Sequence, residues 1–312
     1  MLYKKGIYLF TCLLPLLGLS QTNDTLSYDG IVRVIYLDSF VVTAKKKGFS
    51  TESFIKKVRE DKTFYQAFRN LRFVNYKSDN QITFYNKKYR EKANYSSKTQ
   101  QWSDGKCRIT HFSEEQASPK FFKRKDYRYY TAKLYDKVFF SKDTVCDQPN
   151  SPAYDENAKG IHKHYQELKK LIFEPGTKVD VPFIGKKMAL FDEKMTEYYD
   201  YSIRIQPYKN VECYVFTAKV KEEFQAKKRG KTVIKYMETF FERNSFQILA
   251  RNYHLVYYGA VFNFDVEMSV QLTKKGNKYL PELVEYDGRW DIPLKKPEIA
   301  KFKARLYDFE LP

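Results

Sequence analysis

The sequence is poor in the residues that build flexible linkers and paired-cysteine motifs. Its 312 residues include 12 glycines and 11 prolines, too few for a linker-rich or disordered chain. Only four cysteines occur, and none forms a Cys-x-x-Cys pair, the motif of many redox and zinc sites. Beyond residue 20, no apolar stretch approaches the ~20 residues of a membrane-spanning helix. We therefore expect a mature chain that is soluble or peripheral to a membrane.

The motifs of the common enzyme classes are also missing. There is no Gly-x-Ser-x-Gly, His-Glu-x-x-His, P-loop or dinucleotide fingerprint in strand–helix context. Cys107 and His111 share one face of a possible strand but lie ~13 Å apart along it, too far for a thiolate–imidazole pair. Asp265 and Glu267 lie ~7 Å apart, a spacing that suits a glycosidase, but the rest of their face is polar. We interpret that face as solvated and predict a protein without catalytic residues, cofactor or metal.

The N-terminus has the pattern of a secretory signal. Lys4 and Lys5 precede the apolar run Ile7–Leu17, which has the length of a signal-peptide core and is too short to span a membrane. We predict a signal peptide over residues 1–20, whose cleavage leaves Gln21 first and exports the protein.

Export changes the interpretation of charge and cysteine. The net charge of +18 is typical of nucleic-acid binding, but an exported protein rarely meets nucleic acid. Lipid head groups, lipopolysaccharide and acidic glycans are the anions outside the cytoplasm, and lysines spread over solvated faces explain the charge equally simply. The mature chain keeps Cys107, Cys146 and Cys213, an odd number. Export permits disulfides, but burial as small apolar residues is favoured, and any pairing stays open.

Aromatic residues are abundant, and one stretch shows how they are arranged. The chain has 27 Tyr and 25 Phe, which suit strand surfaces and cavity rims. Ala260–Leu272 alternates apolar and polar residues without a break. Because successive side chains of a strand point to opposite faces, the stretch predicts one dry and one wet face. Its length suggests a large curved sheet. Arg128–Phe140, another aromatic run, is also predicted as a strand.

Two amphipathic helices are predicted to cover the dry face. Ser50–Leu71 has apolar residues at helical spacing with a break near Asp61, and His162–Phe173 is ended by a Pro-Gly pair. The predicted fold class is α+β: a large curved antiparallel sheet, or half-barrel, with helices packed on the concave face. Residues 21–48 form an N-terminal strand segment, and residues 49–312 form a single half-barrel-like domain with a loop insertion near 141–160.

The dry face must be covered by helices, a second sheet or a ligand. If the helices cover only part of it, an apolar groove remains for an acyl chain. The candidate lining residues are Phe262, Phe264, Val266, Met268 and Val270 from the strand, with Phe54 and Phe68 from the first helix.

The order of helix, β-meander, helical insertion and second β-meander resembles the LolA/LolB outer-membrane lipoprotein carriers. The local patterns are Lys231–Arg243 followed by Phe246–Arg251, two strands around a turn, and Tyr279–Leu283, a later strand with a proline. The resemblance implies a half-barrel that binds acyl chains of lipoproteins between sheet and helices, in the periplasm or at the outer-membrane periphery of a Gram-negative cell. The carriers' single gating arginine has no clear counterpart here, and the basic charge and long middle insertion depart from the family.

The predicted function is a non-enzymatic periplasmic or cell-envelope protein that binds lipid or lipoprotein acyl chains in an apolar groove. The alternative is an envelope module that binds an anionic surface, such as lipopolysaccharide or a glycan, or a protein partner through basic aromatic faces.

Overall fold

The computed structural model describes residues 35–37, 51–124, 126–140, 142–146, 172–178, 184–225, 230–259, 263–291 and 295–311. All of them belong to one compact unit, Arg33–Pro312. The predicted signal peptide, Phe262 and most of the predicted helix His162–Phe173 lie outside the described residues.

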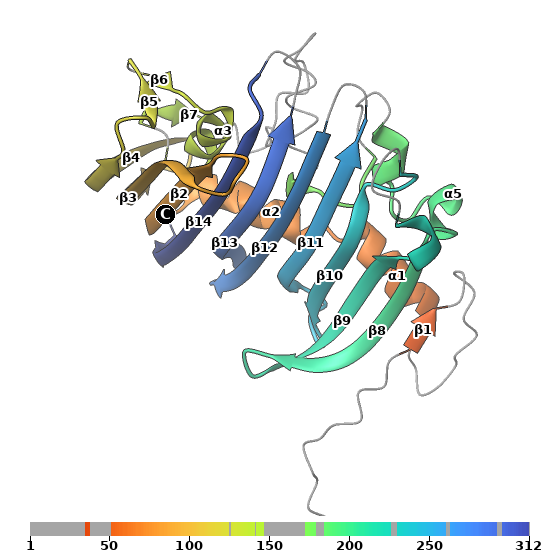
Figure 1. Ribbon diagram of the computed structural model, residues 1–312. Helices are drawn as coiled ribbons and strands as arrows, with labels where there is room; N and C mark the ends of the chain where they lie inside the picture. The colour runs from red at the N-terminus through yellow and green to blue at the C-terminus, as the bar shows by residue number, and fades with distance from the viewer. Residues whose placement is uncertain are drawn as a thin grey trace, which may run out of the picture. The chain divides into compact units, whose positions relative to one another are not determined.

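The described chain is dominated by one antiparallel sheet of 12 strands, which is open rather than closed on itself (Figure 1). The strand order is β1-β8-β9-β10-β11-β12-β13-β14-β2-β3-β4-β7. The strands are β1 (Ile35–Leu37), β2 (Asn75–Tyr85), β3 (Glu91–Ser103), β4 (Cys107–Ala117), β7 (Val145–Cys146), β8 (Tyr199–Tyr208), β9 (Val211–Val220), β10 (Ile234–Glu242), β11 (Ile248–Tyr258), β12 (Asn263–Lys275), β13 (Lys278–Asp291) and β14 (Glu298–Glu310). The large antiparallel sheet predicted from the sequence is confirmed.

The remaining described elements are short. They are α1 (Thr51–Glu60), α2 (Thr63–Asn70), α3 (Tyr130–Phe139), α5 (Glu193–Thr196), the 3-10 helices η1 (Leu71–Phe73), η2 (Gly185–Met188) and η3 (Glu222–Phe224), and a separate two-stranded sheet of β5 (Phe122–Lys123) and β6 (Asp126–Tyr127).

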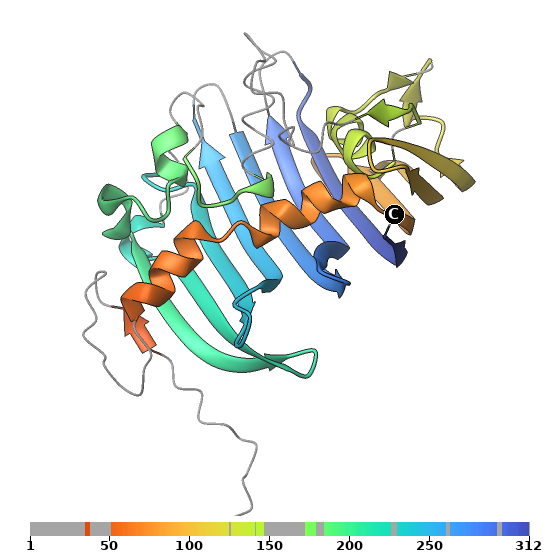
Figure 2. The ribbon, with the colours of Figure 1, turned by 180° about the vertical axis from the view of Figure 1, so that it is seen from behind.

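Helices α1 and α2 run across the strands on one face of the sheet, here called the helix face (Figure 2). The ring of Phe54 in α1 packs edge-on against Tyr214 and Phe241 at centroid distances of 5.5 and 5.9 Å. In α2, the ring of Phe64 meets that of Tyr253 at 6.4 Å. Short helices owe most of their stability to such packing, so this aromatic contact holds α1 and α2 in place. The opposite side of the sheet is called the open face.

The predicted helix break at Asp61 is confirmed. Helix α1 ends at Glu60 and α2 begins at Thr63. The backbone N–H and the hydroxyl of Thr63 donate to the Asp61 carboxylate at 3.0 and 2.7 Å. A carboxylate beside the start of a helix satisfies backbone donors that lack helical partners, and Asp61 does so for the first N–H group of α2.

The predicted strand Arg128–Phe140 is wrong, because most of it forms helix α3. Tyr135 and Phe139, four residues apart and therefore on one helical face, both pack on Phe302 of β14, at 3.9 and 5.4 Å. The Glu298 carboxylate of β14 accepts hydrogen bonds from the N–H groups of residues 130 and 131 at 2.7 and 2.9 Å. A long-range cap and a packed face thus outweigh the strand preference of the aromatic residues.

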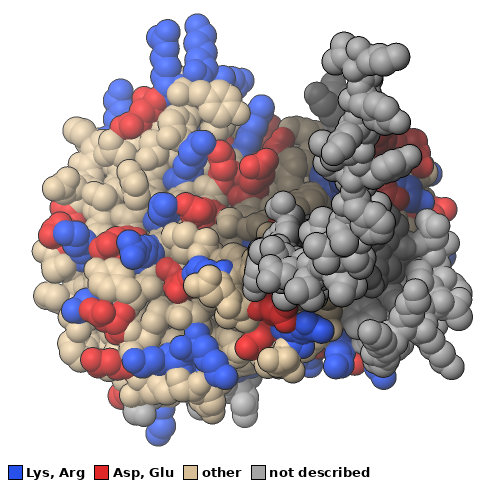
Figure 3. All heavy atoms as spheres, turned by 90° about the horizontal axis from the view of Figure 1, so that it is seen from below, with Lys and Arg blue, Asp and Glu red and all other residues tan. Residues whose placement is uncertain are grey.

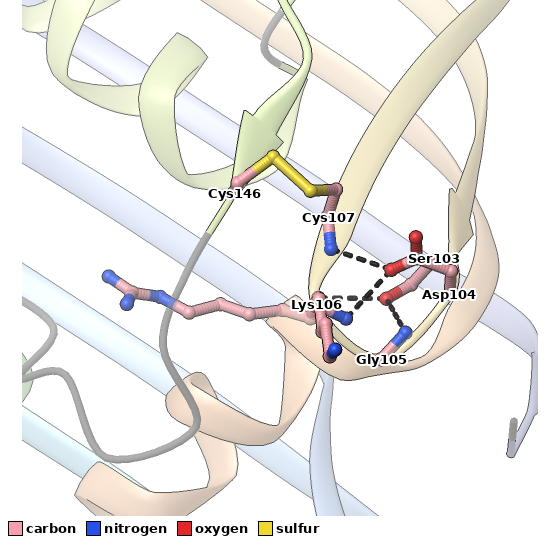
Figure 4. The surroundings of a disulfide bond; sticks show 7 residues. Ser103, Asp104, Gly105, Lys106, Cys107 and Cys146 are labelled. Carbon is pink, nitrogen blue, oxygen red and sulfur yellow. Dashed lines mark hydrogen bonds between the residues drawn. A yellow bond between two sulfur atoms is a disulfide. The ribbon is translucent and has the colours of Figure 1, made fainter.

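The expectation that the cysteines are buried as unpaired apolar residues is wrong for two of the three. Cys107 of β4 and Cys146 of β7 form a disulfide at one end of the sheet (Figure 4). Beside it, the Asp104 carboxylate accepts from the backbone N–H groups of Lys106 and Cys107, both at 2.7 Å. Cys213 is buried and free, as expected.

The capping role of Glu298 predicts a measurable loss of stability. Glu298→Ala removes the acceptor of two backbone N–H groups and of the Thr131 hydroxyl, so we expect the free energy of unfolding to fall by about 1–2 kcal/mol. Glu310→Ala, on the same strand but exposed, is the matched control and should change it little. Urea denaturation measures both. Equal effects of the two substitutions would contradict the capping role.

Candidate functional site

The apolar residues predicted to line a groove point to the helix face and are buried there. Of the seven, six are described: Phe264, Val266, Met268, Val270, Phe54 and Phe68, each 5% exposed or less. They belong to one hydrophobic core that also contains residues of α2 and α3. They form the contact between sheet and helices, and their assignment to a ligand groove stays a prediction.

A cavity of about 680 Å³ lies on the same face, beside the junction of α1 and α2. This volume is within the range of ~300–1,000 Å³ for small-molecule sites. Residues 173–177, 189, 191 and 192 also border it. Its apolar walls include Val58, Phe64, Phe173, Phe191 and Met237. None of the six described groove residues lines it, so this cavity lies at a neighbouring part of the helix face.

Arg251 brings a positive charge to this cavity. It lies on β11 opposite Val270 of β12, and its side chain is buried. Its Nε donates to the Thr239 hydroxyl at 3.0 Å. Its guanidinium carbon lies 4.7 Å from the centre of the Phe64 ring, within the range of a cation–π contact. The arginine is therefore held from two sides, by the sheet and by α2.

Asp61, at the junction of α1 and α2, is the acidic counterpart of Arg251 in the cavity. Burial lowers the pKa of Arg251 to about 10, although the negative charge of Asp61 acts in the opposite direction. Burial likewise raises the pKa of Asp61, opposed by the hydrogen bonds from Thr63 and the charge of Arg251. Burial removes water from both charged groups, and the attraction between the two charges offsets part of that cost. The result is a cavity whose lining is part apolar and part charged, because Arg59, Glu60, Lys62, Arg69, Glu174 and Asp192 also line it.

A second, apolar cavity lies where α3 approaches Ile172 and Phe173 over the helix face. Its volume is about 30 Å³, the share of a single water molecule in the liquid. Packing of α3 thus nearly fills this end of the helix face, and the cavity beside α1 and α2 is more than twenty times larger.

The candidate catalytic groups considered from the sequence are engaged in other ways. Cys107 is in a disulfide and has no thiolate. Asp265 accepts from the His254 ring at 2.7 Å and from the Tyr258 hydroxyl at 3.2 Å, and the bond from His254 is the main reason that its pKa is lowered. Glu267 is exposed on the open face. Among the described residues, no group of three or more His, Cys, Asp or Glu is placed to hold a metal ion.

The comparisons with known proteins are distant. No family model matches this chain, and no curated protein matches it. A DUF1329 family protein from Desulfovibrio piger is 10% identical over 80% of this chain and 92% of that one, with a TM-score of 0.25. A domain assigned to outer membrane lipoprotein sorting, from Vibrio parahaemolyticus, is 6% identical over 78% of this chain and 88% of that one, with a TM-score of 0.26.

A lipoprotein-sorting domain is thus among the matches, as the resemblance to lipoprotein carriers would lead one to expect. At such identities and TM-scores, neither likeness indicates what this chain binds. No described helix has the length and apolar character needed to cross a membrane.

The electrostatic interaction of Arg251 and Asp61 predicts non-additive effects on stability. Arg251→Met and Asp61→Asn each leave the remaining charge buried without its counterpart, and each should lower the free energy of unfolding. The double variant should lose less than the sum of the two, with a coupling of about 0.5–3 kcal/mol. Urea unfolding of the four proteins at neutral pH gives this number. Strict additivity would show that the two charges do not interact.

Proposed function

We propose that this protein is a non-enzymatic cell-envelope protein that binds a lipid or lipoprotein acyl chain between its sheet and helices α1 and α2. In this proposal the sheet is a half-barrel and the helix face is its concave face. The observation that carries the proposal is the cavity of about 680 Å³, in whose lining apolar walls lie beside charged side chains, among them the buried Arg251. The walls suit an acyl chain, and Arg251 suits the ester or amide carbonyl that links such a chain to its head group.

Helices α1 and α2 are suited to move when a chain enters. They have 10 and 8 residues, too few to be stable helices without packing partners. Polar contacts join α2 to the sheet at its two ends. The Thr63 hydroxyl lies 3.1 Å from the Gln247 side-chain amide, and the Asn70 amide donates to the Tyr279 carbonyl at 3.0 Å. In this proposal, a small displacement of α2 extends the cavity toward the buried apolar residues of β12. The predicted groove residues on β12 would then contact the acyl chain.

The disulfide supports a location outside the cytoplasm. Disulfides form and persist in oxidising compartments such as the bacterial periplasm, and Cys107–Cys146 joins two strands of the main sheet. Together with the predicted signal peptide, this favours a periplasmic or outer-membrane-peripheral protein.

The distribution of charge favours an acyl chain over an anionic surface. On the open face, Lys301 pairs with Asp287 at 2.7 Å and Lys303 with Glu285 at 2.8 Å. Figure 3 views the molecule from below, and on the part of that side not covered by grey atoms the basic and acidic side chains are interspersed. Lysines that already have acidic neighbours attract an anionic surface weakly, because the two charges cancel at a distance.

Acyl binding is tested by filling the cavity. Purified mature protein should bind a fluorescent palmitoyl probe, and native mass spectrometry should detect lipid-sized adducts after gentle extraction. Ala189→Trp places a large ring at the border of the cavity and should weaken probe binding at least about tenfold, because volume available to the chain is lost. Ala117→Trp, exposed on β4, is the matched control.

Salt separates this function from the alternative. Raising the salt concentration from about 0.1 M to 1 M shortens the Debye screening length to about 3 Å. Binding of an acyl chain depends on apolar contacts and should persist. A clean apo mass, together with probe binding that Ala189→Trp leaves unchanged, would refute the proposal. Loss of binding at high salt would instead favour an anionic surface.

Thiol counting tests the disulfide and the compartment together. Burial raises the pKa of the Cys213 thiol to about 11, so the count is made in denaturant, where this thiol reacts. The exported mature protein should show one reactive thiol, and three after reduction. Protein made without residues 1–20 in a reducing cytoplasm should show three from the start. Three thiols in the exported form would contradict the pairing.

A further inference from the structure

The open face has a hollow of its own, similar in size to the cavity beside α1 and α2. A trough of about 770 Å³ lies over β10–β14 and β2, on the side away from α1 and α2. A neighbouring hollow of about 540 Å³ over β2–β4 and β14 shares Gln81 and Lys303 with it. The two together form a polar depression that crosses most of the sheet.

Two cross-strand rows of polar side chains form the floor of this trough. The strand register aligns the first row as His254, Glu267, Asp287, Lys301 and Thr83. In this row Asp287 and Lys301 are paired at 2.7 Å. Their two charges are therefore compensated within the floor.

The second row runs parallel to the first. It consists of Asn252, Ser269, Glu285, Lys303 and Gln81. The Ser269 hydroxyl donates to Asn252 at 2.8 Å, and Lys303 pairs with Glu285 at 2.8 Å. The floor thus combines hydroxyl, amide, carboxylate and ammonium groups. Groups of each kind make a contact with a neighbour and can make a further hydrogen bond to a ligand.

Aromatic rings stand at the two ends of the trough. Tyr236 lines it from β10 and Tyr85 lines it from β2. These strands are five positions apart in the sheet, so the trough spans about 24 Å at ~4.8 Å per strand. Each tyrosine offers an apolar ring with a polar tip.

We infer that this trough is a second binding site, which takes an uncharged linear oligosaccharide lying across the strands. Its length fits an extended chain, and four of the five charged side chains in the two rows form two ion pairs, which leaves Glu267 as a carboxylate acceptor and favours a hydroxyl-rich ligand over a highly charged one. Neighbouring sugar hydroxyls accept and donate at once, which matches the mixed groups of the two rows. The tyrosine rings suit the C–H faces of sugar rings. The inference is independent of the acyl site, which lies on the other side of the sheet.

A peptide fits this face less well than a saccharide. Sheets recognise extended peptides mainly at their edges, through unpaired backbone groups. Here β11, β12, β13 and β14 each have a partner strand on both sides, so their backbone groups are used within the sheet. A ligand over the centre of this face therefore contacts side chains and not the backbone. Side-chain hydrogen bonds of this kind suit a polyhydroxylated chain.

The test uses a panel of neutral linear hexasaccharides: maltohexaose, cellohexaose and chitohexaose. Calorimetry and saturation-transfer NMR on the mature protein should detect binding of at least one. Gln81→Ala, an exposed residue that borders both hollows, should weaken binding about tenfold through a lost hydrogen bond. Gln100→Ala, on the adjacent strand β3 and opposite Lys77, is the matched control and should leave binding unchanged. Urea unfolding confirms that both variants fold.

Three results would overturn the inference. One is that no member of the panel binds at about 1 mM. Another is binding that Gln81→Ala and Tyr236→Ala both leave unchanged. The third is that charged peptides bind the trough in preference to the saccharides and are released by salt. Ala189→Trp should leave saccharide binding intact, so failure at one site is distinguishable from failure at the other.

Discussion

The pairing of β14 with β2 is the contact on which the rest of the structure depends. These are the last strand and the first long strand of the described chain, and they are joined in antiparallel register with Phe302 opposite Ile82. In the strand order, β2, β3, β4 and β7 connect to the other strands only through this pair. Without it there would be two smaller sheets, and Lys301 and Lys303 would not lie beside Thr83 and Gln81 at the centre of the open face. Pairings between strands this far apart in sequence also tend to slow folding.

The same sheet presents two different environments because side chains alternate along each strand. On β12, Val266 and Met268 enter the aromatic core, whereas Glu267 and Ser269 lie on the floor of the polar trough. A shift of one residue in register would exchange the two sets. The hydrophobic core therefore fixes the alignment of the polar rows as well. An apolar site and a polar site can coexist on one sheet for this reason.

The sequence predicted local features well and long-range ones poorly. The two faces of β12 and the helix break at Asp61 follow from nearest-neighbour chemistry, and both appear in the structure. Helix α3 was not predicted, because its capping carboxylate, Glu298, comes from a strand at the other end of the chain. The disulfide likewise joins residues whose proximity depends on tertiary structure.

The candidate sites were harder to predict than the fold. Arg251 sits between two small or polar residues, so its face could not be assigned before the register with Val270 was known. The polar face of β12 was interpreted as simply solvated. Its hollow arises only when five strands bring their polar residues into rows, and no single stretch of sequence contains that pattern.

The disulfide has a further consequence for the integrity of the molecule. Cys107 and Cys146 are 39 positions apart, and the segment between them contains β5, β6 and helix α3. Those elements therefore lie on a covalently closed ring. By chain-entropy arguments a ring of this size disfavours the unfolded chain by about 4 kcal/mol. A protease that cut once inside the ring would release no fragment, because both ends would remain fastened to β4 and β7. The part of the chain that seals one end of the aromatic core thus stays attached after a single cut.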